Sequence, residues 1–157
     1  MIKCASVARG IKEIKKRTII TGEDYVSFET AKLLKEKGFN EPCRFIYDAG
    51  YFCSIASTDC RWNEGYGELV EELSNSEFSG IDNRISAPTL QMAMKWLREV
   101  HKLYCDIRVG DGDFVIDIIS LKDGEFGCEV VEPESCVYLT YEEACEAAIK
   151  YCLENLI

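Results

Sequence analysis

Residues 86–157 read SAPTLQMAMKWLREVHKLYCDIRVGDGDFVIDIISLKDGEFGCEVVEPESCVYLTYEEACEAAIKYCLENLI, and this stretch carries the clearest structural pattern in the chain. Near both of its ends, apolar residues recur three and four positions apart, which is the spacing of one face of a helix. The pattern predicts helices over residues 88–103 and 141–155, the second of them capped by Thr140. Between the helices, apolar and polar residues alternate as they do in strands. The stretch therefore predicts a helix, a meander of antiparallel strands and a second helix.

Local signals for the start of the first helix and for the turns between strands support this prediction. Ser86 or Thr89 can cap the first helix, and Pro88 suits its first turn, where the missing N–H costs nothing. Residues 110–112, Gly-Asp-Gly, predict a turn between two strands. A third strand is expected within residues 127–139.

Upstream, the segment SFETAKLLKEKGF predicts another helix near residues 27–37, with Ser27 as its N-terminal cap. Gly38 fits the left-handed position just beyond the end of a helix. Phe39 would then fold back onto Leu34, which is the hydrophobic contact that accompanies a Schellman motif.

After Pro42, the segment CRFIYDAGYFCSIAS predicts a β-hairpin around residues 48–50, Asp-Ala-Gly, while residues 58–85 carry no clear pattern. Together, these elements predict the α+β class, with an antiparallel sheet of about five strands and helices packed mainly on one face. We expect a single domain over residues 1–157, in which residues 1–20 form a basic, loosely ordered arm.

Charge is divided unevenly along the 157-residue chain, whose composition of 47% hydrophobic and 29% charged residues is that of a globular protein. Residues 1–17 carry a net charge of +5, and the remainder carries −15. An acidic body repels the phosphate backbone, so nucleic-acid binding is disfavoured except through residues 1–17. No apolar run approaches the roughly 20 residues that a membrane-spanning helix needs, so no membrane partner is expected.

Nine cysteines accompany a single histidine, His101. Because the start of the chain lacks a signal-peptide pattern, we expect a cytoplasmic protein with reduced thiols. A cysteine nucleophile with a histidine base would have to use His101, which leaves a small hydrolase or a ligand-binding domain as an alternative function. The alternative for these residues is packing in the core. The cysteines considered as partners of His101 are Cys43, Cys53, Cys60 and Cys105.

No motif for a metal, a nucleotide or a cofactor stands out. No cysteine pair has the CxxC spacing of zinc ribbons, and the glycines do not match a phosphate-binding loop. Four aspartates crowd the 106–117 hairpin, but their spacing fails the pattern of calcium-binding loops, and turn chemistry explains them. We assign no catalytic residue, no metal ligand and no cofactor.

Aromatic residues gather in and after the first hairpin, beginning at Phe45. Aromatic side chains beside irregular loops carry much of the energy of protein interfaces. We therefore predict a protein-binding surface formed by Tyr47, Tyr51, Phe52, Trp62 and Tyr66.

Two resemblances bear on function. The helix–three strands–helix order of residues 86–157 resembles the topology of double-stranded RNA-binding domains. In that family, lysines at the start of the last helix grip phosphate, whereas this chain has Glu142, Glu143 and Glu146 there, so RNA binding by this route is disfavoured.

Three further segments, ETAKLLKEKGF, SAPTLQMAMKWLREVH and YEEACEAAIKYCLENLI, are similar to small proteins encoded by phages, prophages and other mobile elements of gut bacteria. The resemblance implies a mobile-element setting and a cytoplasmic location, and it transfers no residue roles. We expect an accessory protein, more a non-enzymatic interaction domain than an enzyme, whose partner is a host or phage protein. The sequence does not indicate an oligomeric state.

Overall fold

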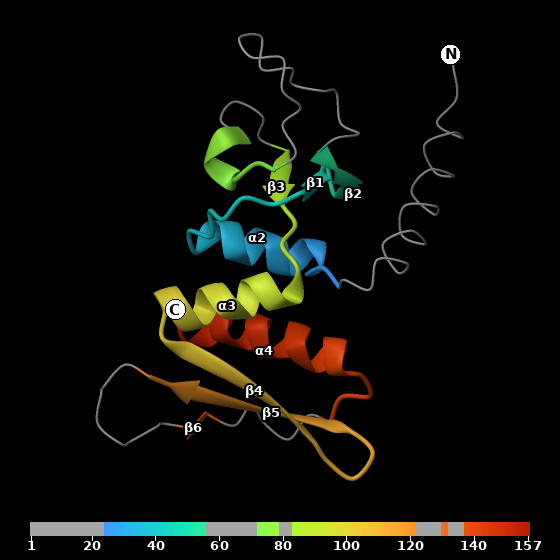
Figure 1. The fold of residues 1–157 in the computed structure, drawn as a ribbon, viewed down its shortest axis with the longest axis vertical. Coiled ribbons are helices and arrows are strands. Elements are labelled where there is room, and N and C mark those ends of the chain that lie inside the picture. Colours follow the sequence, from blue (N-terminus) through green and yellow to red (C-terminus); the bar gives the residue numbers. More distant parts are fainter. Residues whose placement is uncertain (1–23, 56–71, 79–82, 122–129, 132–136) are drawn as a thin grey trace. The chain divides into compact units, whose positions relative to one another are not determined.

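A computed structural model describes the chain over residues 24–55, 72–78, 83–121, 130–131 and 137–157. The chain forms two compact units, residues 1–88 and 89–157. Both units combine helix with antiparallel strands, which confirms the predicted α+β class (Figure 1). The single domain expected over residues 1–157 stays a prediction.

The first unit is a small sheet accompanied by a helix. Its strands follow the order β2-β1-β3, and both neighbouring pairs are antiparallel. Its elements are helix α2 (Phe28–Glu36), strands β1 (Phe45–Asp48) and β2 (Tyr51–Ser54), the short 3-10 helix η2 (Asn75–Phe78) and strand β3 (Arg84–Ser86).

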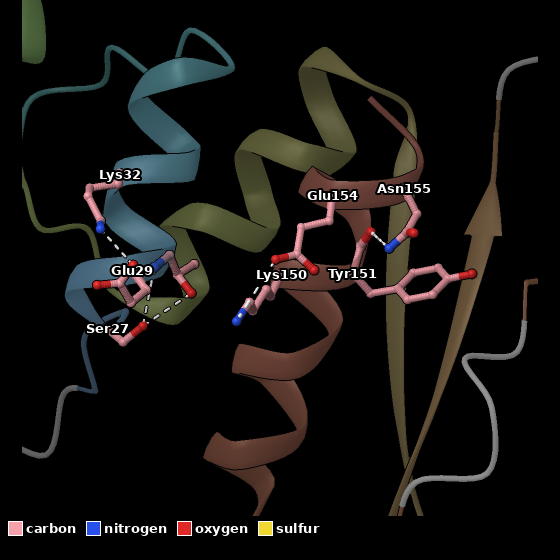
Figure 2. Close-up of polar contacts among 8 residues, drawn as sticks. Ser27, Glu29, Lys32, Lys150, Tyr151, Glu154 and Asn155 are labelled. Carbon is pink, nitrogen blue, oxygen red and sulfur yellow. Dashed lines mark hydrogen bonds and ion pairs between the residues drawn. The ribbon is translucent and has the colours of Figure 1, made fainter.

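Both ends of α2 follow the local signals in the sequence. The hydroxyl of Ser27 accepts a hydrogen bond from the backbone N–H of Thr30, so Ser27 is the N-terminal cap, and Figure 2 shows it beside the Glu29–Lys32 ion pair. At the other end, Gly38 adopts a φ of 92°. The N–H groups of Phe39 and Gly38 donate to the carbonyl oxygens of Leu34 and Lys35, which are the two bonds of a Schellman motif.

The β1–β2 hairpin lies where the sequence predicts it. Only Ala49 and Gly50 separate the strands, and both have positive φ, 48° and 83°, as the two central residues of a type I′ turn do. Because side chains alternate between the two faces of a strand, this register fixes which aromatic residues share a face. One face includes Ile46, which packs in a core cluster with Ile55 and Phe78.

The second unit is a meander flanked by two helices, in the order that residues 86–157 predict. Its elements are helix α3 (Leu90–Val100), strands β4 (Leu103–Val109), β5 (Phe114–Ser120) and β6 (Val130–Val131), and helix α4 (Tyr141–Asn155). The strands form an antiparallel sheet in the order β4-β5-β6, against which α4 packs. The stripe Ala144, Cys145, Ala148, Ile149, Cys152 and Leu153 is buried along α4.

The start of α3 corrects one detail of the sequence reading. Thr89 is the cap, because its hydroxyl accepts from the N–H of Met92. Ser86, the other candidate, instead pairs with Ile46 as the last residue of β3. Pro88 therefore precedes the cap and is not part of the first helical turn.

The far ends of both helices are well defined. Helix α3 stops at Val100, three residues before the predicted end, because Lys102 adopts a φ of 59° and Leu103 begins β4. Helix α4 runs to Asn155 as predicted. Figure 2 shows the amide of Asn155 donating to the carbonyl oxygen of Tyr151 in its last turn.

The prediction of one five-stranded sheet is wrong for the described residues, because the strands divide between two small sheets. Strand β1 pairs on one side with its hairpin neighbour β2 and on the other with β3, which the sequence reading did not foresee. Only three residues, Arg84, Ile85 and Ser86, form β3, and so short a segment shows no alternation.

Candidate functional site

Five aromatic rings pack together in the first unit and form what we call the aromatic cluster: Tyr25, Phe28, Phe45, Tyr47 and Phe52. Phe45 and Phe52 stack with ring centroids 5.1 Å apart and planes within 4° of parallel. The ring centroids of Tyr25 and Phe45 are 4.9 Å apart. Phe28, the first residue of α2, packs edge-on against Tyr47, with ring centroids 5.3 Å apart. Ring pairs at these separations stabilise a fold beyond the area they bury. The cluster therefore fastens the hairpin to the start of α2.

Tyr47 is the most constrained ring of the aromatic cluster. Its hydroxyl donates a hydrogen bond to the carbonyl oxygen of Val26, 2.7 Å away, and Val26 is fully buried. Its ring also meets Phe52 at 5.5 Å, directly across the strand pair. Both side chains are half-buried, and their contacts stabilise the fold.

Tyr51 lies on the other face of the hairpin from Tyr47 and Phe52. The pairing of Asp48 with Tyr51, next to that of Tyr47 with Phe52, places the two tyrosines on opposite faces. Tyr51 is 58% exposed, which makes it the most exposed aromatic side chain among the described residues. The three predicted site residues that the structure describes thus do not share one face of the hairpin.

The remaining two predicted site residues, Trp62 and Tyr66, lie outside the described residues. Tyr25 and Phe28 belong to the aromatic cluster, although the sequence reading gave neither a binding role. Phe28 begins α2, and no signal in the sequence linked it to the hairpin strand that begins at Phe45, 17 positions later.

His101 is the C-terminal cap of α3, and its backbone N–H donates to the carbonyl oxygen of Leu97. Its ring packs edge-on against Trp96, with centroids 4.5 Å apart. The cysteine nearest in sequence, Cys105, is directed elsewhere, because its Sγ lies 3.8 Å from Sγ of Cys152. These positions favour a packing role for His101 over that of a base for Cys105.

The two described cysteines of the first unit are poor nucleophiles. Burial and the nearby Glu72 carboxylate raise the pKa of Cys43 to about 12. Burial also raises the pKa of Cys53, with a further contribution from the Asp48 carboxylate. Since the thiolate is the reactive form, both side chains remain unreactive thiols near neutral pH. Cys60 lies outside the described residues.

Two of the four aspartates of the β4–β5 hairpin, Asp117 and Asp113, take part in contacts within the hairpin. The carboxylate of Asp117 forms an ion pair with Arg108 on the neighbouring strand. The backbone carbonyl of Asp113 accepts from the N–H of Gly110, which closes the turn. Within the described part of the chain, no three histidine, cysteine or acidic side chains come together as a metal site would require.

The described residues also contain no helix with both the length and the apolar character needed to cross a lipid bilayer. Comparison with protein-family models, with curated proteins and with solved structures gave no match. The candidate site therefore rests on its own geometry, which is an exposed tyrosine at a tight turn, on the opposite face of the hairpin from the Tyr47 and Phe52 rings.

Proposed function

We propose that this protein is a non-enzymatic interaction domain that binds a host or phage protein in the cytoplasm through the β1–β2 hairpin. The resemblance of three of its segments to small phage and prophage proteins supports the mobile-element setting. The exposed ring of Tyr51 supports the binding role, and this observation carries the proposal.

Tyr51 combines exposure with a rigid support. It is the first residue of β2, next to a two-residue turn, and the aromatic cluster fastens this hairpin to α2. Tyrosine presents a large contact area with few rotatable bonds, so immobilising it on binding loses little entropy. A rigid hairpin reduces that cost further, because the backbone is ordered before the partner arrives.

The charge of the protein narrows the kind of partner. Outside residues 1–17, the chain carries a net charge of −15, which disfavours acidic partners and nucleic acids. A partner with a basic or neutral surface around an apolar pocket would suit both the charge and the tyrosine ring. Interfaces of this kind concentrate their energy in a few aromatic anchors.

Site-specific photo-crosslinking tests the proposal. The full chain, with a benzophenone amino acid in place of Tyr51, is irradiated in the cytoplasm of the bacterium that carries the gene. We expect one predominant cross-linked protein, whose purified form is then used for binding measurements. The matched control carries the same group in place of Tyr104, which is 40% exposed and lies in the second unit.

Alanine variants then measure the contribution of the ring. Tyr51→Ala should weaken binding of that partner at least tenfold, whereas Tyr104→Ala should change it less than twofold. Unchanged binding of the partner by Tyr51→Ala, in a protein whose thermal unfolding matches that of the wild type, would refute the hairpin as the contact. The genes that flank this one provide a separate test of the mobile-element setting.

A further inference from the structure

Two cysteines far apart in the sequence meet inside the second unit. Cys105 lies on β4, and Cys152 lies near the end of α4. Their Sγ atoms are 3.8 Å apart. Cys152 is fully buried, whereas Cys105 is partly exposed. The pair therefore combines one partly exposed cysteine with one fully buried cysteine.

The hydrogen bond between the two thiols makes them chemically different. Either sulfur can donate in this contact. A hydrogen bond from the Cys152 thiol favours the thiolate of Cys105 and so lowers the pKa of Cys105 against the opposing effect of burial. The same bond, together with burial, raises the pKa of Cys152. Cys105, which is the more exposed residue of the pair, is thus the favoured thiolate, and thiolates are the form that oxidants attack.

We propose that Cys105 and Cys152 form a reversible disulfide when the protein meets a peroxide, which joins strand β4 to helix α4. This site is independent of the proposed interaction through Tyr51, which lies in the other unit. The sulfur atoms must approach by roughly 2 Å to reach the length of a disulfide bond. Because the pair lies between a strand and a helix that already pack together, side-chain rotation and a small backbone shift provide this approach.

The reaction takes place in two balanced steps. The Cys105 thiolate attacks one peroxide oxygen, the O–O bond breaks, and the departing oxygen takes up a proton to leave as an alcohol or water. Cys105 is then a sulfenic acid. The Cys152 thiol attacks that sulfur, the S–O bond breaks, and water leaves with the thiol proton. Two thiols have lost two electrons, and the peroxide has gained them.

Trypsin separates this pair from every other cysteine. Cleavage after Lys102 and Arg108 gives a peptide, residues 103–108, whose only cysteine is Cys105. Cleavage after Lys150 gives the C-terminal peptide, residues 151–157, whose only cysteine is Cys152. A link between these two peptides is therefore diagnostic.

The experiment treats the reduced full chain with hydrogen peroxide, blocks remaining thiols with N-ethylmaleimide, and digests the product. We expect the two peptides to appear as one linked species about 2 Da lighter than their sum, and dithiothreitol should separate them again. Recovery of both peptides unlinked, or linked only to other cysteines, would overturn the proposal.

Single variants identify the role of each sulfur. Cys152→Ser should leave Cys105 as a sulfenic acid that dimedone labels, whereas the wild type should lose that label as the disulfide forms. Cys145→Ser is the matched control, because Cys145 is equally buried on the same helix, and it should keep the link. Loss of the link in Cys145→Ser with wild-type thermal stability would also contradict the assignment. The wild-type digest keeps the test valid if a variant fails to fold.

Discussion

The hydroxyl of Tyr47 donates a hydrogen bond to the backbone carbonyl oxygen of Val26, and the two oxygen atoms lie 2.7 Å apart. The bond joins the central strand of the first sheet to the segment that enters α2. Val26 is fully buried, so water could not readily replace the Tyr47 hydroxyl as the hydrogen-bond partner of this carbonyl if the hydroxyl were removed. Tyr47, which was predicted to bind a partner, thus also stabilises the fold.

Tyr47→Phe should lower the free energy of unfolding by about 1–2 kcal/mol, because it removes the hydroxyl and leaves a buried acceptor. Urea denaturation of the full chain measures the loss. The matched control is Tyr51→Phe, which removes a hydroxyl from a side chain that is 58% exposed and should cost less than about 0.5 kcal/mol. Equal losses in the two variants would show that the Tyr47 hydroxyl contributes nothing special.

The turn beside Tyr51 allows a second prediction, in which substitutions at its two residues change the stability of the protein in opposite directions. Ala49 has a φ of 48°, a region that asparagine tolerates better than alanine, so Ala49→Asn should stabilise the protein by about 0.5 kcal/mol. Gly50 has a φ of 83°, and Gly50→Ala should destabilise it by about 1 kcal/mol.

The cause at Gly50 is backbone strain, because an added Cβ would meet the Phe28 ring at an ordinary contact distance of 3.8 Å. Thermal unfolding of the two variants beside the wild type provides the comparison. A shift of both midpoints in the same direction would contradict the assigned turn.

The cap of α4 allows a third prediction. The hydroxyl of Thr140 accepts from the N–H of Glu143, 3.1 Å away. Thr140→Ala should lower stability by about 1 kcal/mol, and Thr140→Ser, which keeps the hydroxyl, should retain most of it. Urea midpoints, together with amide hydrogen exchange in the first turn of α4, measure the effect. If serine costs as much as alanine, the methyl group and not the cap is responsible.

Local signals explain why much of the fold could be predicted from the sequence. The caps Ser27 and Thr140 and the left-handed Gly38 act on neighbouring residues, so their patterns are complete within a few positions. The pairing of β1 with β3 is different, because it joins Tyr47 to Ile85 across 38 positions. Nothing in either segment indicates its partner, which is why a single larger sheet was expected.

The candidate site shows the same limit at the scale of single side chains. The sequence located the aromatic residues of the hairpin, but the face each one occupies depends on the length of the turn. A two-residue turn pairs Asp48 with Tyr51 and so separates Tyr51 from Tyr47. The contact of Cys105 with Cys152 joins residues 47 positions apart, and each alone had the pattern of an ordinary core residue.

Glu77 provides a prediction for pH. Its carboxylate accepts hydrogen bonds from the backbone N–H and the hydroxyl of Ser74, at 2.7 and 2.8 Å. These bonds lower the pKa of the Glu77 carboxyl below its usual value. The folded state is therefore stabilised above the unfolded pKa of about 4.3, and this contribution is lost as the pH falls through the lower folded value.

An NMR titration of the Glu77 side chain tests this in wild type and Ser74→Ala. We expect the pKa to rise toward the usual value in the variant, because the hydroxyl donor is gone while the backbone donor remains. Ser76→Ala is the control, since the Ser76 hydroxyl contacts Ser74 and Asn40 but is not one of the two groups that donate to Glu77. An unchanged Glu77 pKa in Ser74→Ala would mean that the backbone N–H alone sets the shift, and acid-induced unfolding should then be the same in both proteins.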